Sequence, residues 1–161
     1  MSGPLVRPWA LAGALAALVL AADQVAKAAV EANLVPGEHV EVLGPLELTL
    51  AHNRGVAFGL AGGAGLGLIA VTLAALGLIV YLFARDPGRR GMWLATGLVA
   101  GGALGNLADR VFAGEVTDYI AVGSWPPFNL ADVAITCGVA LLALIYVRDA
   151  ESQAESEAEG G

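Results

Sequence analysis

The sequence predicts an all-α membrane protein with four transmembrane helices and a small extracytoplasmic β-sheet. Of its 161 residues, 57% are hydrophobic and only 14% are charged, which is too apolar a chain for one soluble core. A helix of about 20 mostly apolar residues crosses the hydrocarbon layer of a bilayer. Four segments fit when small residues are tolerated: 9–29, 66–83, 92–107 and 130–147. We expect residues 1–148 to form a single four-helix membrane domain.

The small sheet is expected between the first two spans, at about 38–58. Apolar residues recur there with a period of two on either side of a Gly44-Pro45 turn. They are Val40, Val42, Leu46, Leu48 and Leu50. This period is typical of strands, so two short strands should lie outside the membrane against the helices.

Basic residues near the span ends predict the orientation. One side carries Arg7, Arg85, Arg89, Arg90 and Arg148. The other side carries Lys27, Arg54 and Arg110. Because lysine and arginine are enriched in cytoplasmic loops, both termini should be cytoplasmic. We interpret 9–29 as a retained helix and not a secretory signal, because no convincing small-x-small cleavage site follows it.

The end of the chain differs in composition from the predicted spans. The stretch "RDAESQAESEAEGG" contains five acidic residues against one arginine and no apolar residue beyond alanine. Such a composition is typical of disorder. Residues 149–161 are therefore predicted to form a disordered acidic cytoplasmic tail.

Two aspartates on the outer side are the strongest candidates for chemistry. Asp118 follows the third span and Asp132 lies one turn into the fourth, and a short connection places these helix ends close together. Two carboxyl groups that approach one another share a proton, so that one acts as a base towards water and the other as an acid. This arrangement is that of an aspartic protease.

Helix capping is an alternative explanation for Asp132. In "NLAD", Asn129 would be the N-cap and Asp132 the N3 residue, a pairing that contributes about 1 kcal/mol to helix stability. Capping explains Asp132 alone. It gives no reason for Asp118, Asn106 and Arg110 to gather at the same rim.

Other polar residues leave more than one interpretation open. Asp23 and Lys27 are spaced i, i+4 and can pair, either to fix the depth of the first helix or to serve a site. Asn53, taken alone, would be a turn residue. His39 and His52 lack metal-ligand spacing, so no metal site is predicted.

Five blocks of the sequence together resemble a known family. They are "DQVAK" at 23–27, "NRGVAFG" at 53–59, "GGALGNLADR" at 101–110, "VTDY" at 116–119 and "FNLADVAI" at 128–135. The chain resembles the lipoprotein signal peptidases, the type II signal peptidases of bacteria. The resemblance implies an aspartic endopeptidase of the inner membrane with its active site at the extracytoplasmic face. It would remove signal peptides from diacylglyceryl-modified prolipoproteins by cleaving on the amino side of the lipidated cysteine.

The resemblance also assigns roles to residues. Asp118 and Asp132 would be the catalytic pair. Positions that line the site or hold the substrate would be Asn53, Asn106, Arg110 and Asn129, with Asp23 and Lys27 supporting them. Besides the prolipoprotein, we expect membrane lipid as a partner, no cofactor, no metal, no nucleic acid and a monomeric state.

Two other classes of function compete with a protease. Acidic residues in apolar helices are also typical of proton-coupled transporters. However, the polar residues cluster at one rim, whereas a transport path needs them in both halves of the membrane. A non-catalytic assembly subunit would explain the sheet, but it gives no reason for two acids to converge.

Overall fold

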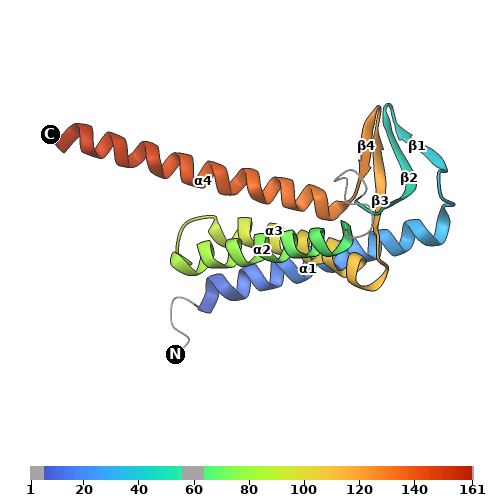
Figure 1. The fold of residues 1–161 in the computed structure, drawn as a ribbon. Coiled ribbons are helices and arrows are strands. Elements are labelled where there is room, and N and C mark those ends of the chain that lie inside the picture. Colours follow the sequence, from blue (N-terminus) through green and yellow to red (C-terminus); the bar gives the residue numbers. More distant parts are fainter. Residues whose placement is uncertain (1–5, 56–63, 161) are drawn as a thin grey trace.

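The computed structural model describes residues 6–55 and 64–160, which form a helical bundle with a sheet at one end (Figure 1). Its helices are α1 (Val6–Asn33), α2 (Ala64–Arg85), α3 (Met92–Phe112) and α4 (Leu130–Gly160). The start of α1 and the end of α4 lie at the end of the bundle away from the sheet (Figure 1). Each predicted span thus falls within one helix.

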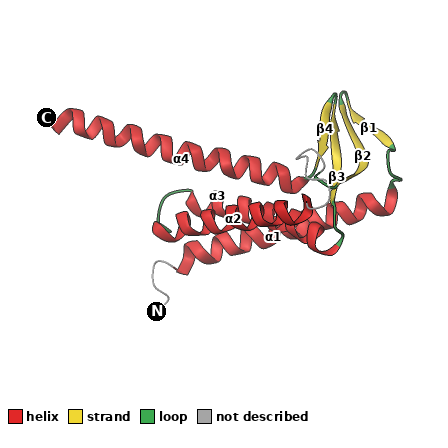
Figure 2. Ribbon diagram, in the orientation of Figure 1, coloured by secondary structure: helices red, strands yellow, loops and turns green. Residues whose placement is uncertain are grey.

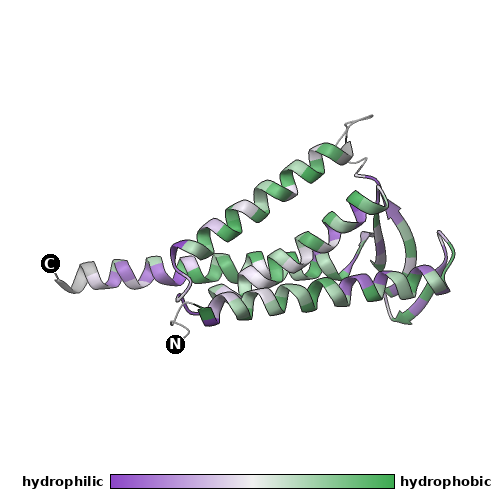
Figure 3. Ribbon diagram, turned by 90° about the horizontal axis from the view of Figure 1, so that it is seen from below, coloured by the Kyte–Doolittle hydropathy of each residue, from purple (hydrophilic) through white to green (hydrophobic). Residues whose placement is uncertain are grey.

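Three helices of the described chain are long and apolar enough to cross a membrane. These segments are Val6–Asn33, Leu66–Arg85 and Leu130–Ser156. Apolar residues follow the lengths of these helices, whereas α4 becomes hydrophilic where it leaves the bundle (Figure 3). The remaining helix, α3, packs against each of the other three. Because its neighbours cover it, α3 carries small residues where the outer helices carry large apolar ones.

Glycines of α3 bring the backbone of α1 unusually close. A Cβ atom added to Gly101 would lie 2.7 Å from the carbonyl oxygen of Ala16 and 2.7 Å from the Cβ of Val19. At Gly97 an added Cβ would lie 2.9 Å from the side chain of Leu15. The contact surface of α3 for α1 is therefore formed by Gly97 and Gly101, which lie four residues apart.

The sheet is antiparallel, with its four strands in the order β1-β2-β3-β4 (Figure 2). The strands are β1 (His39–Leu43), β2 (Leu46–Asn53), β3 (Val116–Val122) and β4 (Trp125–Phe128). The predicted hairpin is confirmed, with Gly44 at positive φ between β1 and β2. The end of the predicted range, 56–58, lies outside the described residues.

The second hairpin was not predicted from the sequence. Four successive residues of β3 are buried, so its sequence lacks the alternation that marks a half-exposed strand. In β4, Pro126 and Pro127 argue against a strand, although proline is tolerated at a sheet edge. Asp118 accordingly lies on a strand rather than in a simple loop after α3.

The end of the chain also differs from its prediction. Residues 149–160 continue α4, whereas their composition had suggested disorder. Alanine and glutamate favour helix, and a helix already formed upstream adds each further residue without a new nucleation cost. An ion pair of 2.9 Å between Arg89 and Asp149 also ties the first of these residues to the bundle.

Candidate functional site

The first turn of α4 is held by a reciprocal cap. Asn129 Oδ1 accepts the backbone N–H of Asp132 at 3.0 Å, and Asp132 Oδ2 accepts the backbone N–H of Asn129 at 3.2 Å. Two free N–H groups at the helix start are thereby satisfied. The cap interpretation of Asp132 is confirmed, and it fixes where this half-buried carboxylate stands.

Asn129 also joins the cap to Asp118. Its side-chain amide donates to Asp118 Oδ1 at 2.7 Å. Asn129 is fully buried and Asp118 is only 3% exposed. Asp118 reaches this position because β3 pairs with β2, where Ala51 lies opposite Asp118. One residue therefore contacts both aspartates, which come from a strand and from a helix.

Asn106 of α3 supports Asp132 from the other side. Its side-chain amide donates to Asp132 Oδ1 at 2.8 Å. Its own side-chain oxygen accepts from Lys27 Nζ and from Asn129 Nδ2, each at 3.1 Å. Since Asn106 is also buried, its orientation is set by these partners. An amide held this way can only present N–H to Asp132.

The predicted pair of Asp23 and Lys27 is confirmed as an ion pair, with Lys27 Nζ 2.7 Å from Asp23 Oδ2. Lys27 Nζ also lies 2.6 Å from Asp109 Oδ2, a partner on α3. Asp23 Oδ1 accepts the backbone N–H of Ala131 at 2.9 Å, so α1 holds the first turn of α4. The side chains of Asp23, Lys27 and Asp109 are largely buried. Lys27 connects them to the aspartates by donating to Asn106.

Asn53 contacts Asp118, whereas Arg110 bonds to neither aspartate among the described residues. Asn53, at the end of β2, donates to Asp118 Oδ2 at 3.0 Å and accepts the N–H of Gly55 at 2.9 Å. It is thus both a turn residue and a partner of Asp118. Arg110 donates to the carbonyl oxygen of Asn106 at 3.1 Å. Among the described residues, it makes no hydrogen bond to either aspartate.

Burial raises the pKa of Asp118 from 3.8 to about 6. The hydrogen bond from Asn53 opposes this rise, the negative charge of Asp132 adds to it, and the hydrogen bond from Asn129 opposes it. A carboxyl group with such a pKa can hold a proton near neutral pH. Asp132, like Asp118, accepts N–H groups at both of its oxygens, but it is only half-buried. The two carboxyls therefore stand in different environments, as an acid and a base must.

An apolar pocket of about 330 Å³ adjoins Asp132, between β4 and the first turns of α4. Its lining comes from β4 and the first turns of α4: Trp125, Phe128, Asp132, Val133, Thr136 and Cys137. Sequence reasoning missed this pocket. The signal available was the i+1, i+4 and i+5 spacing of Val133, Thr136 and Cys137 after Asp132, which places them beside it on the helix.

Sequence reasoning also left out two residues of the buried polar cluster. Gln24 Nε2 donates to Asp109 Oδ1 at 2.9 Å, and Asp109 pairs with Lys27. Both contacts join α1 to α3, so no spacing within one helix reveals them. Within residues 6–55 and 64–160, no three His, Cys, Asp or Glu side chains gather closely enough to hold a metal ion.

Comparisons with known proteins agree with this geometry. The sequence profile of the family described as signal peptidase (SPase) II matches residues 15–148. The lipoprotein signal peptidase of Syntrophomonas wolfei is 44% identical over 138 residues, which cover 84% of this chain and 92% of that protein. That of Aquifex aeolicus is 45% identical over 116 residues, or 67% of this chain and 70% of that protein.

A solved structure described as "Bacterial membrane enzyme structure by the in meso method at 2.3 A resolution" has the same fold. It superposes with a TM-score of 0.79 at 33% identity, covering 88% of this chain and 90% of that one. The profile match spans most of the chain, and the fold agrees over nearly the same length. The chain therefore belongs to the signal peptidase II family.

Proposed function

We propose that Asp118 and Asp132 are the catalytic pair with which this inner-membrane peptidase removes signal peptides from prolipoproteins. The observation that carries the proposal is that Asn129 bonds to both carboxylates. The bond to be cut lies on the amino side of a cysteine that carries diacylglycerol. No metal or cofactor is needed for this reaction.

The reaction divides between the two carboxyl groups. Asp118, whose pKa is raised, enters protonated, while Asp132 takes a proton from the attacking water. The water oxygen bonds to the scissile carbonyl carbon as Asp118 gives its proton to the carbonyl oxygen. The tetrahedral intermediate, a gem-diol, then collapses as Asp132 gives its proton to the leaving nitrogen and the C–N bond breaks. At the same time Asp118 takes a proton back from one of the two hydroxyl groups, which leaves the new carboxyl group and restores both aspartates. Asn129 and Asn106 keep the carboxyls oriented throughout.

The remaining site residues position the catalytic carboxyls or the substrate. Asn53 holds Asp118 from the outer side, and Asp23 with Lys27 fixes Asn106 and the start of α4. Arg110 lies at the same rim on α3 and would meet the substrate there, since a guanidinium can donate to a carbonyl or ester oxygen. In this proposal the protein acts as a monomer.

The helix ends support an orientation with both termini in the cytoplasm. Arg85 ends α2, Arg89 and Arg90 connect α2 to α3, and Arg148 lies where α4 continues beyond the bundle. These arginines gather at the end away from the sheet, which favours that end as cytoplasmic. The sheet and both aspartates then face the extracytoplasmic side.

The helix α3 would be the fourth span. It has 21 residues, and at about 1.5 Å per residue a helix of that length crosses the hydrocarbon core. Its glycines and its polar end are covered by its neighbours, so it need not be strongly apolar to cross. A membrane-anchored substrate would then present its cleavage site at a nearly fixed depth, beside the apolar pocket at Asp132.

Cleavage by purified variants tests the catalytic pair. The protein in detergent is incubated with a diacylglyceryl-modified prolipoprotein, alongside Asp118→Asn and Asp132→Asn. Each variant should lose roughly 10²–10⁴-fold in rate, as expected when general acid or base catalysis is removed. Asp86→Asn changes an exposed aspartate away from the site and should retain wild-type activity.

The same assay separates the competing functions. Near wild-type cleavage by either site variant would contradict the assignment of the pair. A proton-coupled transporter would need two sealed compartments, so cleavage in detergent identifies a peptidase directly. Unmodified prolipoprotein should be a poor substrate because the lipid contributes binding, and equal turnover of both forms would contradict that role of the lipid.

A further inference from the structure

A second pocket, which is more polar than the one beside Asp132, lies at the end of the bundle away from the aspartates. It has a volume of about 430 Å³ and lies between the ends of α2 and α4. We call it the arginine pocket; its lining consists of Tyr81, Leu82, Arg85, Asp86, Arg89, Met92 and Tyr146. None of these residues takes part in the proposed reaction.

The two arginines of the pocket differ in their ion-pair partners. Arg89 pairs with Asp149 at 2.9 Å and with Asp86 at 3.6 Å, and it lies 4.6 Å above the ring centre of Tyr146. Arg85 donates to the hydroxyl of Tyr81, at 3.0 Å. Among the described side chains, no carboxylate forms an ion pair with Arg85. Arg89 is thus held by carboxylates of the protein, whereas Arg85 can bind the anionic group of a ligand.

An apolar groove adjoins this pocket at Leu82, on the side towards the middle of the bundle. A cavity of about 150 Å³ between α2, α3 and α4 is lined by Ala75, Leu78, Ile79, Leu82, Val99 and Leu142, among others. Leu82 lines both cavities. From Leu82 to Ala75 the groove follows α2 for about 10 Å, at about 1.5 Å per residue. A ligand that fills both spaces must have a polar anionic head and a hydrocarbon chain.

We propose that the arginine pocket and this groove bind one anionic phospholipid. Its phosphate is held by Arg85 and the hydroxyls of Tyr81 and Tyr146, and one acyl chain lies in the groove. Guanidinium groups bind phosphate strongly, and tyrosines are enriched at the membrane interface. Basic pockets between transmembrane helices bind anionic headgroups in the same way. The proposal does not rest on the proposed function, because the two sites share no residue.

Native mass spectrometry of the intact protein in detergent tests the lipid site. Phosphatidylglycerol is compared with phosphatidylcholine of the same acyl chains and with glycerol phosphate, which has none. We expect one tightly retained phosphatidylglycerol and much weaker binding of the other two probes. Equal retention of phosphatidylcholine would overturn the role of the charge. Equal retention of glycerol phosphate would overturn the role of the groove and indicate a site for free phosphate.

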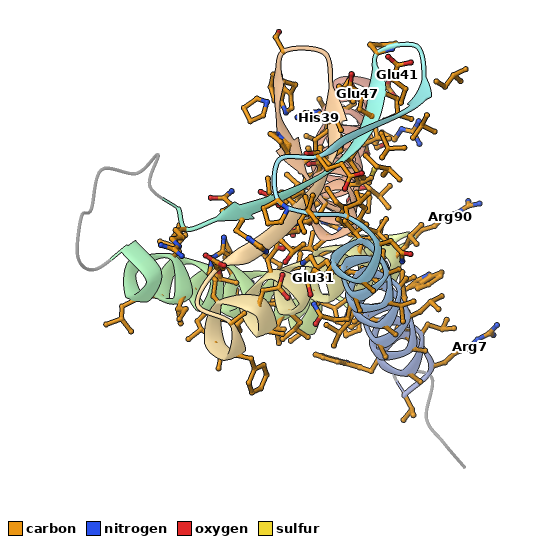
Figure 4. All side chains as sticks on the ribbon, turned by 90° about the vertical axis from the view of Figure 1, so that its right-hand side faces the viewer. Arg7, Glu31, His39, Glu41, Glu47 and Arg90 are labelled. Carbon is orange, nitrogen blue, oxygen red and sulfur yellow. The ribbon has the colours of Figure 1, made fainter. Side chains whose placement is uncertain are left out.

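Three variants locate the site. Arg85→Gln should weaken phosphatidylglycerol binding about tenfold, as expected for the loss of a charge-assisted hydrogen bond. Ala75→Phe should weaken it by filling the groove from an exposed position while Arg85 is intact. Arg7→Gln removes an exposed arginine that projects away from the bundle (Figure 4) and should leave binding unchanged.

The variants also exclude trivial explanations. Thermal unfolding without added lipid should match the wild type for all three, which rules out a loss of fold. An equal loss of binding in Arg7→Gln and Arg85→Gln would show general charge attraction and overturn the proposal. Unchanged binding in Ala75→Phe would remove the acyl chain from the groove and overturn it as well.

Discussion

The side-chain amide of Asn129 donates to Asp118 Oδ1 at 2.7 Å, so the cap of α4 is also a partner of a strand residue. Its side-chain oxygen meanwhile accepts the backbone N–H of Asp132. One side chain therefore performs two tasks, capping a helix and orienting a carboxylate. Substitutions can separate them, because a hydroxyl group can cap a helix but is too short to reach Asp118.

We predict that Asn129→Ser will be about 1 kcal/mol more stable than Asn129→Ala, since serine retains a capping oxygen. Both variants should lose most of their cleavage activity, because both lose the hydrogen bond to Asp118. Thermal unfolding in detergent and the cleavage assay measure the two effects. Equal stability would contradict the cap, and wild-type cleavage by Asn129→Ser would show that the bond to Asp118 is dispensable.

The pKa of Asp118 predicts how stability depends on pH. Because burial raises this pKa from 3.8 to about 6, the folded protein binds the proton more tightly than the unfolded chain does. The resulting stabilisation is fully present below about pH 4 and is lost as pH rises through about 6. The stability of the wild type relative to Asp118→Asn should therefore decrease from about pH 4 to about pH 6. Above about pH 6 it should stay constant.

The control for this pH series is Asp86→Asn, which removes an exposed aspartate at the other end of the bundle. Its difference from wild type should be nearly constant between pH 4 and pH 7. A constant difference for Asp118→Asn as well would show that Asp118 has an ordinary pKa in the folded protein.

A substitution at Asn53 should change the pKa of Asp118 without disturbing the packing of the core. It is exposed, yet its hydrogen bond to Asp118 is the main interaction that lowers the pKa of that carboxyl. We expect Asn53→Ala to raise the pKa of Asp118 further and to shift the pH profile of kcat/KM to higher pH. Thermal stability should change by less than that of Asn129→Ala.

The matched control is Asn33→Ala, an exposed asparagine on α1 that bonds to the carbonyl oxygen of Ala29. It should leave the pH profile in place. An unshifted profile for Asn53→Ala would mean that water replaces the lost donor at Asp118.

Local patterns were predicted from the sequence where the interaction is itself local. The pair of Asp23 and Lys27 follows from i, i+4 spacing, and the cap follows from the three-residue spacing of Asn129 and Asp132. The β1-β2 hairpin follows from period-two apolar residues around Gly44. Each of these depends on backbone geometry within a few residues.

Contacts between distant segments could not be predicted from such local patterns. Strand β3 is buried over most of its length, so no alternation marks it, and it is a strand because β2 lies beside it. Asp109 pairs with Lys27 only because α1 and α3 cross closely. The continuation of α4 depends on the helix that precedes residue 149 and not on the composition of the acidic stretch alone.

The close crossing of α1 and α3 yields the last prediction. A Cβ atom at Gly101 would lie 2.7 Å from the carbonyl oxygen of Ala16, a backbone atom that cannot move without shifting α1. Overpacking of this kind typically costs about 1–3 kcal/mol. Gly101→Ala should therefore be destabilised by about that amount in detergent unfolding.

Gly13→Ala is the matched control, because a Cβ atom there has no neighbour within 4 Å. Alanine favours helix over glycine by about 0.5–1 kcal/mol, so this variant should be as stable as wild type or more so. Since α1 also carries Asp23 and Lys27, a shift of α1 in Gly101→Ala should lower cleavage as well as stability. If Gly101→Ala proved as stable and as active as Gly13→Ala, the close contact of α1 with α3 would not position the site.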